Sequence, residues 1–228
     1  ASSAGKTKKK SSESSVKPDE SELRSWIDMC LLNFELNYEN FDAIALLNSI
    51  FALGKLKIWP GDLLLSRWFS APQKYFECDS LRFADLARLM HACSQLFFVP
   101  SQEFVVRLND WAPRRIKSEA SCVEITMLWG ALGRLRIKPQ APLLSASLMK
   151  LRTLVKEGNC DGQAVSTFFW AMARMGIKPE GSFLTALSEM LEIVVSQMNS
   201  LELSNIMWSY AALGVYPSQL LLKRWGSR

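Results

Sequence analysis

Five segments that end on proline repeat nearly the same phrase and decide the fold. They are FALGKLKIWP (51–60), HACSQLFFVP (91–100), GALGRLRIKP (130–139), WAMARMGIKP (170–179) and WSYAALGVYP (208–217). The five align without a gap, and successive prolines are 40, 39, 40 and 38 residues apart. Because a fixed period of this length is the signature of stacked supersecondary units, the sequence predicts a repeat protein.

Each phrase reads as the end of a helix that begins 18 residues before its proline. Four of the five starting positions hold Asp, Ser or Asn, whose short side chains cap helix N-termini. The positions are Asp42, Arg82, Ser121, Asp161 and Asn199. Proline cannot continue the helix that precedes it. A small residue stands eight positions before every proline, which predicts close approach of neighbouring helices at Ala52, Ala92, Ala131, Ala171 and Ser209.

A partner helix is expected after each proline. Paired apolar residues follow at offsets four and five, at Leu64 and Leu65, Phe104 and Val105, Leu143 and Leu144, Phe183 and Leu184, and Leu221 and Leu222. Offset eight adds Trp68, Leu108, Leu187 and Trp225, with Ser147 as the exception. This spacing is helical rather than strand-like.

The predicted fold class is therefore all-α, an α-solenoid of stacked helix-turn-helix repeats of 38–42 residues over residues 18–228. About five repeats and a terminal half-repeat are expected to start near Pro18, Pro60, Pro100, Pro139, Pro179 and Pro217. One helix pair cannot bury its own apolar face, whereas stacked pairs share a continuous core. For the same reason the final half-repeat is expected to pack on a partner or on further chain through Leu220, Leu221, Leu222 and Trp225.

The sequence offers no group of residues for catalysis, metal binding or a cofactor. Its five cysteines form no CxxC pair and mostly fall in apolar helical patterns, so we expect a reducing compartment and no disulfide framework. With His91 as the single histidine, no zinc site can be assembled. A Gly-rich phosphate loop and a GxSxG elbow are missing, and apolar stretches are too short for a membrane span. We expect a protein that is not an enzyme.

Positive charge is unevenly distributed along the chain. Residues 1–17 carry +4 of the net charge of +5 and are expected to form a disordered basic tail rich in Ser and Lys. Residues 18–59 total −4, whereas residues 100–138 and 139–178 each total +3. The basic zone of the repeats is therefore their middle.

Cations at equivalent positions of stacked repeats would line up into stripes that RNA phosphates could follow. The candidates are Lys55, Arg134 and Arg174 five residues before the prolines, Arg67 and Arg107 seven residues after them, the cluster Arg114, Arg115 and Lys117, the pair Lys150 and Arg152 one repeat later, and Lys8, Lys9 and Lys10 of the tail. In the alternative interpretation, these charges are only the solvated faces of the helices.

Aromatic residues give a second set of candidates, because bases can stack on flat rings. Trp59, Trp68, Trp111 and Trp225 are considered, but helical spacing places Trp68 and Trp225 on the packed side. Trp129, Trp170 and Trp208 lie in the helices before the prolines and are interpreted as structural. His91 shares their position and is interpreted as a partly buried packing residue, not as a base or metal ligand.

The phrases LWGALGRLRIKP (128–139), FFWAMARMGIKP (168–179) and IMWSYAALGVYP (206–217) resemble a known family. Over roughly residues 20–228 the chain resembles octotricopeptide repeats and the related FAST-kinase-like and heptatricopeptide proteins. The resemblance implies RNA work in mitochondria or plastids, including binding, processing or stabilising transcripts, or a place on ribosomal RNA in a mitochondrial ribosome.

Three functions remain open at this stage. The first is a non-catalytic RNA-binding protein of the mitochondrion, with the plastid as the alternative, that contacts ribosomal RNA or a transcript beside the neighbouring proteins of a large assembly. The second is a scaffold that holds a peptide or a neighbouring subunit in the solenoid groove, which the acidic first repeat favours. The third is a factor that stabilises or processes transcripts.

Overall fold

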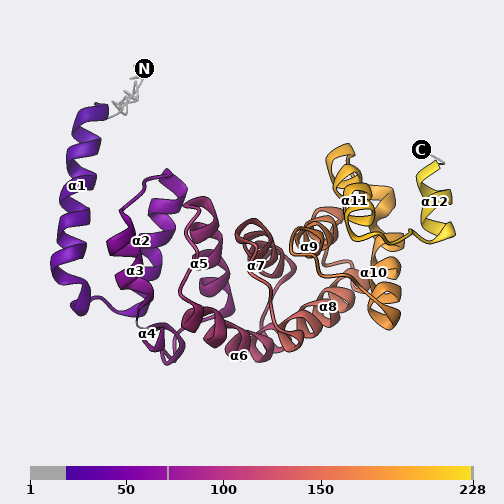
Figure 1. The fold of residues 1–228 in the computed structure, drawn as a ribbon, viewed down its shortest axis with the longest axis horizontal. Helices are drawn as coiled ribbons and strands as arrows, with labels where there is room; N and C mark the ends of the chain where they lie inside the picture. The colour runs from indigo at the N-terminus through magenta and orange to yellow at the C-terminus, as the bar shows by residue number, and fades with distance from the viewer. Residues whose placement is uncertain (1–18, 71, 227–228) are drawn as a thin grey trace, which may run out of the picture. The chain divides into compact units, whose positions relative to one another are not determined.

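The structure, a computed structural model, describes residues 19–70 and 72–226, and this part of the chain is all-helical (Figure 1). The chain divides into two compact units, Ala1–Tyr38 and Glu39–Arg228. The first unit contains the helix α1 (Glu20–Asn37). The predicted basic tail, with Lys8, Lys9 and Lys10, lies outside the described residues.

Two kinds of helix alternate in the second unit. Those that end at the five phrases, here called the second helices, are α2 (Ala43–Leu56), α5 (Phe83–Gln95), α7 (Cys122–Leu135), α9 (Gly162–Arg174) and α11 (Ser200–Leu213). Those that follow the prolines, the first helices, are α3 (Asp62–Phe69), α6 (Gln102–Ser118), α8 (Ala141–Lys156), α10 (Gly181–Val194) and α12 (Gln219–Gly226). The short segments α4 (Gln73–Phe76) and η2 (Val195–Gln197) complete the second unit, and η1 (Tyr38–Asn40) spans the boundary between the units.

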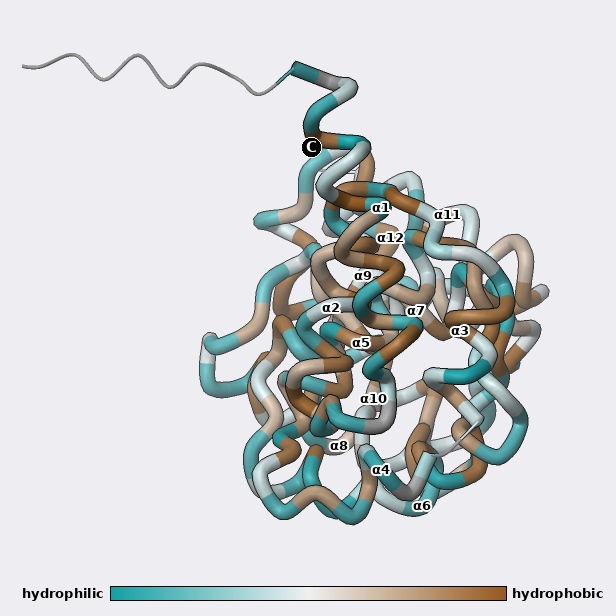
Figure 2. Tube along the Cα trace, turned by 90° about the vertical axis from the view of Figure 1, so that its left-hand side faces the viewer, coloured by the Kyte–Doolittle hydropathy of each residue, from teal (hydrophilic) through white to brown (hydrophobic). Residues whose placement is uncertain are grey.

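The helices of each kind pack beside one another in a row. Each second helix contacts the next one from α2 to α11, and among the first helices α6 contacts α8, α8 contacts α10 and α10 contacts α12. Figure 1 shows α5, α7, α9 and α11 in one row and α6, α8 and α10 in another. Hydrophobic and hydrophilic residues alternate along the helices, as Figure 2 shows. The all-α fold class is confirmed.

The second helices begin where the sequence predicts. Side-chain oxygens of Asp42, Ser121, Asp161 and Asn199 accept backbone N–H groups three residues later, at 2.7–3.4 Å. Arg82, the one residue that cannot cap in this way, is replaced in that role by two carboxylates. Asp85 accepts the N–H of Arg82 at 3.1 Å, and Glu119, the residue after α6, accepts the N–H of Phe83 at 2.9 Å.

All five second helices also end alike, in what we call the closing turn. The residue three positions before the proline is left-handed, with φ between 53° and 64°, at Lys57, Phe97, Arg136, Gly176 and Gly214. The next residue donates its N–H to the carbonyl seven positions before the proline, at 2.9–3.1 Å in every case. This is the Schellman arrangement, which satisfies carbonyls that a helix end leaves unpaired. It fixes the direction in which the chain leaves each second helix.

Small residues let the second helices approach closely, as the sequence predicts. A Cβ atom added at Gly54 would lie 2.9 Å from the Cα of Ala92, and one added at Gly133 would lie 2.9 Å from the Cα of Ala171. Ala92, Ala131, Ala171 and Ser209 are fully buried. The fifth predicted position, Ala52, is exposed on α2, which stands at the N-terminal end of the row of second helices.

We expect Gly133→Ala to destabilise the protein by about 1–3 kcal/mol, because the new methyl group meets backbone atoms that cannot yield locally. Gly130→Ala, one turn earlier on the same helix, is the matched control. Its added Cβ meets only the Thr167 methyl group at 3.5 Å, so the gain in helix propensity should raise stability by about 1 kcal/mol. Urea unfolding of both variants measures this difference. Equal effects would contradict the close approach of α7 and α9.

The expectation that the chain has no disulfide is wrong for one pair of cysteines. Cys122 and Cys160 are disulfide-bonded, with Cα atoms 5.6 Å apart, while Cys30, Cys78 and Cys93 are free thiols. The two residues are 38 positions apart, nearly one repeat, so stacking α7 against α9 brings them together. Burial raises the pKa of the Cys93 thiol, which is fully enclosed.

Removing this link by Cys160→Ser should lower the free energy of unfolding by about 4 kcal/mol, the chain-entropy value for a closed loop of 38 residues. Urea unfolding with and without a thiol reductant measures it. The reductant should bring the wild-type protein down to the level of the variant and leave the variant itself unchanged. Cys78→Ser serves as the control and should keep the sensitivity to reductant.

The predicted apolar positions of the first helices form much of the core. Leu64, Leu65, Trp68, Phe104, Leu108, Leu143 and Leu187 are buried, and so is Ser147.

At the last helix, α12, the predicted apolar residues differ in their exposure. Leu221 is 1% exposed and α12 contacts α10 and η2, so this residue packs within the chain, whereas Leu220 and Leu222 stay exposed.

Candidate nucleic-acid interface

The predicted cations fall on two different rows of helices. Lys55, Arg134 and Arg174 are exposed in the last turns of the second helices α2, α7 and α9. The remaining described candidates lie on the first helices: Arg67 on α3, Arg107, Arg114, Arg115 and Lys117 on α6, and Lys150 and Arg152 on α8. The structure therefore does not bring all of them to one surface.

Several cations of the first helices contact groups of their own chain. Arg152 donates from Nε and Nη2 to the Glu189 carboxylate of α10, at 3.0 and 2.6 Å. Arg115 lies 3.7 Å from the Glu119 carboxylate and its guanidinium is 5.1 Å from the centre of the Trp111 ring. The carboxylates of Glu189 and Glu119 offset charge that a phosphate would need on Arg152 and Arg115, as the ion pair with Asp85 does for Arg88 of α5.

The second helices carry a different arrangement, in which cations lie beside aromatic rings on α2 and α9. We call it the second-helix face and define it by Phe51, Lys55, Arg88, His91, Arg134, Trp170 and Arg174. On α2 the Lys55 ammonium lies 5.7 Å from the centre of the Phe51 ring, and the Arg88 guanidinium of α5 lies 5.8 Å from the same ring. One ring thus stands between cations of two adjacent helices.

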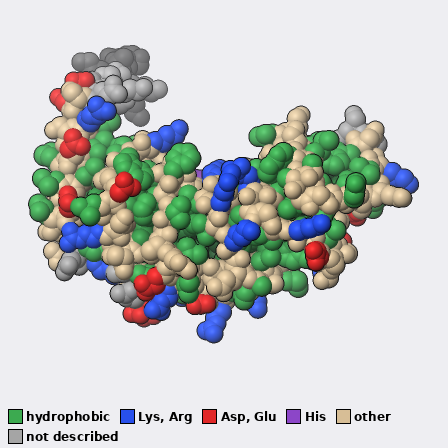
Figure 3. Space-filling view, in the orientation of Figure 1, with side chains coloured by type: hydrophobic (Ala, Val, Ile, Leu, Met, Phe, Trp, Pro, Cys, Tyr) green, Lys and Arg blue, Asp and Glu red, His purple; other side chains and the backbone are tan. Residues whose placement is uncertain are grey.

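The face continues across α7 to α9. Arg134 of α7 donates from Nη1 to the Ser94 hydroxyl of α5 at 3.4 Å. The Trp170 ring of α9 reaches back to α7, where it would lie 3.1 Å from a Cβ atom added at Gly133. The Arg174 guanidinium lies 5.9 Å from the centre of that ring. Figure 3 shows Lys and Arg side chains gathered over the middle of the second unit.

His91 of α5 reports the positive potential of this face. The residue is half-buried, and its pKa is lowered from the ordinary value of 6.5 by burial first, then by the charges of Arg134 and Lys55. These two cations come from the helices on either side of α5. The side chain fills the packing position that the sequence indicates, but it also lies among the cations.

One carboxylate, that of Asp85, contacts the second-helix face through Arg88. Asp85 is buried and ion-paired with Arg88. Burial alone would raise its pKa, but hydrogen bonds from the Arg82 side chain and backbone and from Arg88 outweigh it and hold the pKa below the usual value. Asp85 therefore remains charged and orients Arg88, whose guanidinium also faces the Phe51 ring.

Sequence reasoning missed the aromatic members of the face and Arg88. Trp129 and Trp68 are fully buried, as predicted, whereas Trp208, which is also interpreted as structural, is 44% exposed. Trp170 is half-buried. The sequence could have indicated Arg88, because this residue stands one turn before His91 on α5 and so lies on the same side of the helix.

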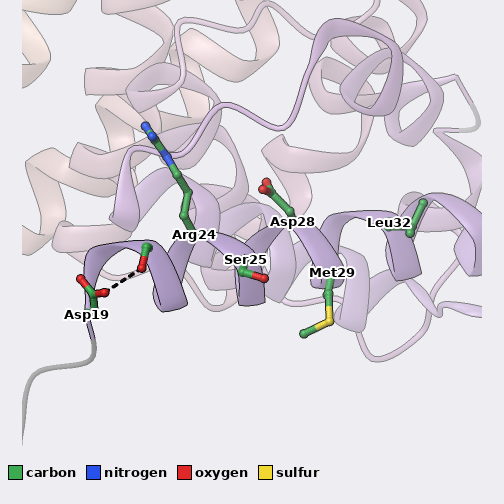
Figure 4. Close-up of a pocket in the computed structure, with 7 residues that line it drawn as sticks. Asp19, Arg24, Ser25, Asp28, Met29 and Leu32 are labelled. Atoms are coloured by element: carbon green, nitrogen blue, oxygen red, sulfur yellow. Dashed lines mark hydrogen bonds between the residues drawn. The ribbon is translucent and has the colours of Figure 1, made fainter.

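One open pocket is lined by Asp19, Ser21, Arg24, Ser25, Asp28, Met29 and Leu32, all of which come from α1 and the residue before it. Figure 4 shows Arg24 and Asp28 on one side and Met29 on the other. Across residues 19–70 and 72–226, no group of three or more His, Cys, Asp or Glu residues could hold a metal ion. No helix in this part is long and apolar enough to cross a membrane.

Compared with known proteins, the sequence matches no family model and no curated protein.

The lowered pKa of His91 predicts how stability depends on pH. The unfolded chain takes up a proton near pH 6.5 and the folded chain only at lower pH, so the contribution of His91 is full above 6.5 and is lost as pH falls below it. Thermal unfolding between pH 7.5 and 5 should show this loss. His91→Phe, which restores the residue type of Phe51 at the equivalent position, should lose less stability over the same interval. Parallel curves for the two proteins would contradict the prediction.

Proposed function

We propose that residues 39–226 form a solenoid of helix pairs that holds single-stranded RNA on the second-helix face and catalyses no reaction. The observation that carries the proposal is a row of cations on four adjacent helices with rings at its two ends, Phe51 beside Lys55 on α2 and Trp170 beside Arg174 on α9. Cations that follow a backbone and rings on which bases stack are the two parts of a single-strand site. Helical repeats can supply two or three such side chains for each base.

A simpler explanation covers part of this face. Lys55, Arg134 and Arg174 stand in last turns, where a cation stabilises the negative end of the helix dipole. That explanation does not extend to Arg88, which lies in the middle of α5, or to the rings beside the cations. It also gives no reason for Trp208 to be exposed on α11. Nucleic-acid binding explains these features together.

Single strands fit better than duplexes because a flat ring can stack only on a base that is itself unstacked. The resemblance of the repeated phrases to organellar RNA-binding repeats supports a mitochondrial role, with the plastid as the alternative. Within that role we favour a ribosomal-RNA-binding or other ribonucleoprotein component. A factor that stabilises or processes transcripts is the second alternative.

A protein scaffold is the first alternative, and one observation favours it. The helix α1 exposes Trp26, Met29, Leu32 and Leu36, each at 56–74%, while it also carries acidic residues. An apolar surface of this kind is suited to a protein partner. A ribonucleoprotein component would use both surfaces, the second-helix face for RNA and α1 for a neighbouring protein.

The double variant Arg134→Ala/Arg174→Ala tests the RNA proposal against the first-helix row. We expect its affinity for a fluorescein-labelled 20-nucleotide RNA of mixed sequence to fall about 10-fold or more. The slope of log K against log salt should become shallower by about 1.4, the single-strand value for two phosphate contacts. Arg107→Ala, an exposed cation of α6, is the matched control and should change neither quantity.

Two results would count against this assignment. A loss of affinity in Arg107→Ala but not in the double variant would move the RNA to the first helices. Wild-type protein without affinity for the RNA at low salt would reject RNA binding and leave the scaffold.

A further inference from the structure

The closing turns present a row of outward side chains that the second-helix face does not include. In each turn the middle residue is buried or half-buried, while the residues three and one before the proline are exposed wherever they carry a long side chain. The exposed residues of this row that carry a charge or a ring are Lys57, Trp59, Phe97, Arg136, Lys138, Lys178 and Tyr216, and we call them the exit edge. It adjoins the second-helix face, since Lys57 follows Lys55 and Arg136 follows Arg134 by two residues.

Three residues of this row hold a backbone conformation that disfavours them. Lys57, Phe97 and Arg136 are left-handed, with φ of 55°, 53° and 55°. The equivalent turns of the two following repeats use Gly176 and Gly214, for which that conformation carries no steric penalty. A side chain is thus retained at three turns where glycine would be the more stable choice.

Packing does not explain why these side chains are retained. Phe97 is 86% exposed, and Lys57 and Arg136 are also exposed, so none of them contributes to the core. None of the ion pairs formed among residues 19–70 and 72–226 involves Lys57, Arg136, Lys138 or Lys178. The fold uses the left-handed backbone, which glycine would also supply, but it does not use these three side chains. Strain of this kind clusters at sites that contact something else.

The chemistry of the row matches that of the second-helix face. Trp59 and Phe97 supply exposed rings on neighbouring turns. Lys57 shares the turn of Trp59, and the other three cations lie on the next two turns along the row. We propose that the exit edge is a second contact line for single-stranded RNA, in which bases stack on Trp59 and Phe97 while phosphates contact Lys57, Arg136, Lys138 and Lys178. The proposal rests on the RNA-binding function and extends it to residues outside the second-helix face.

Glycine substitution separates this proposal from a structural role because stability and binding should change in opposite directions. The triple variant Lys57→Gly/Phe97→Gly/Arg136→Gly removes three strained residues, so its Tm should rise by about 6 °C. Its affinity for a fluorescein-labelled (U)20 RNA should fall at least 10-fold at low salt. Phe97→Ala is the control: it removes the ring but keeps a side chain in the left-handed conformation, so affinity should fall while Tm does not rise.

Each remaining outcome has one meaning. If the triple variant binds (U)20 like the wild-type protein while Arg134→Ala/Arg174→Ala binds it weakly, the exit edge is rejected and the second-helix site stands. If the wild-type protein does not bind (U)20, both proposals fail. If the triple variant loses affinity for poly-glutamate but keeps its affinity for (U)20, the edge takes an acidic polypeptide and the RNA assignment is rejected. A lower Tm in the triple variant would reject the strain on which the argument depends.

Discussion

The hydrogen bond that closes each second helix is the interaction on which the rest of the second unit depends. In each closing turn the backbone N–H two residues before the proline donates to the carbonyl seven residues before the proline. This bond ends the helix and turns the chain away from the helix axis. Because five turns share this geometry, the chain leaves every second helix in the same way. Equivalent residues then meet repeat after repeat, as Gly54 and Ala92 do, and Gly133 and Ala171.

Features that depend on local chemistry could be predicted from the sequence. Helix starts at Asp42, Ser121, Asp161 and Asn199 need only a short polar side chain before a helical pattern, and the prolines mark the ends. The left-handed residue of the closing turn gave no signal, because glycine stands there in two turns and Lys57, Phe97 and Arg136 in the others. Its position became visible only with backbone angles.

Contacts between repeats were harder to predict because they join residues about one period apart. The Cys122–Cys160 disulfide and the Arg152–Glu189 ion pair span 38 and 37 residues. Cys122 and Cys160 form no short cysteine motif, so the sequence does not indicate their disulfide. Arg152 stands among other cations in the sequence, which is why it was predicted to contact RNA and not Glu189. The rings of the candidate site were missed for a related reason: Phe51 and Trp170 fit an apolar helical pattern, and only the packed neighbours show that part of each ring is exposed.

The candidate surface combines side chains that have opposite effects on folding. Lys55, Arg134 and Arg174 favour it, since last-turn cations stabilise helix ends, so their presence alone is weak support for binding. The left-handed residues oppose it, and the exit-edge proposal assigns their side chains a contact outside the fold. The disulfide bears on the last-turn cations. Cys122 begins α7, whose end carries Arg134 about 18 Å away along the helix axis. Cys160 precedes α9, which carries Arg174. A covalent link at one end of α7 and α9 thus limits how far the cations at the other end can move apart.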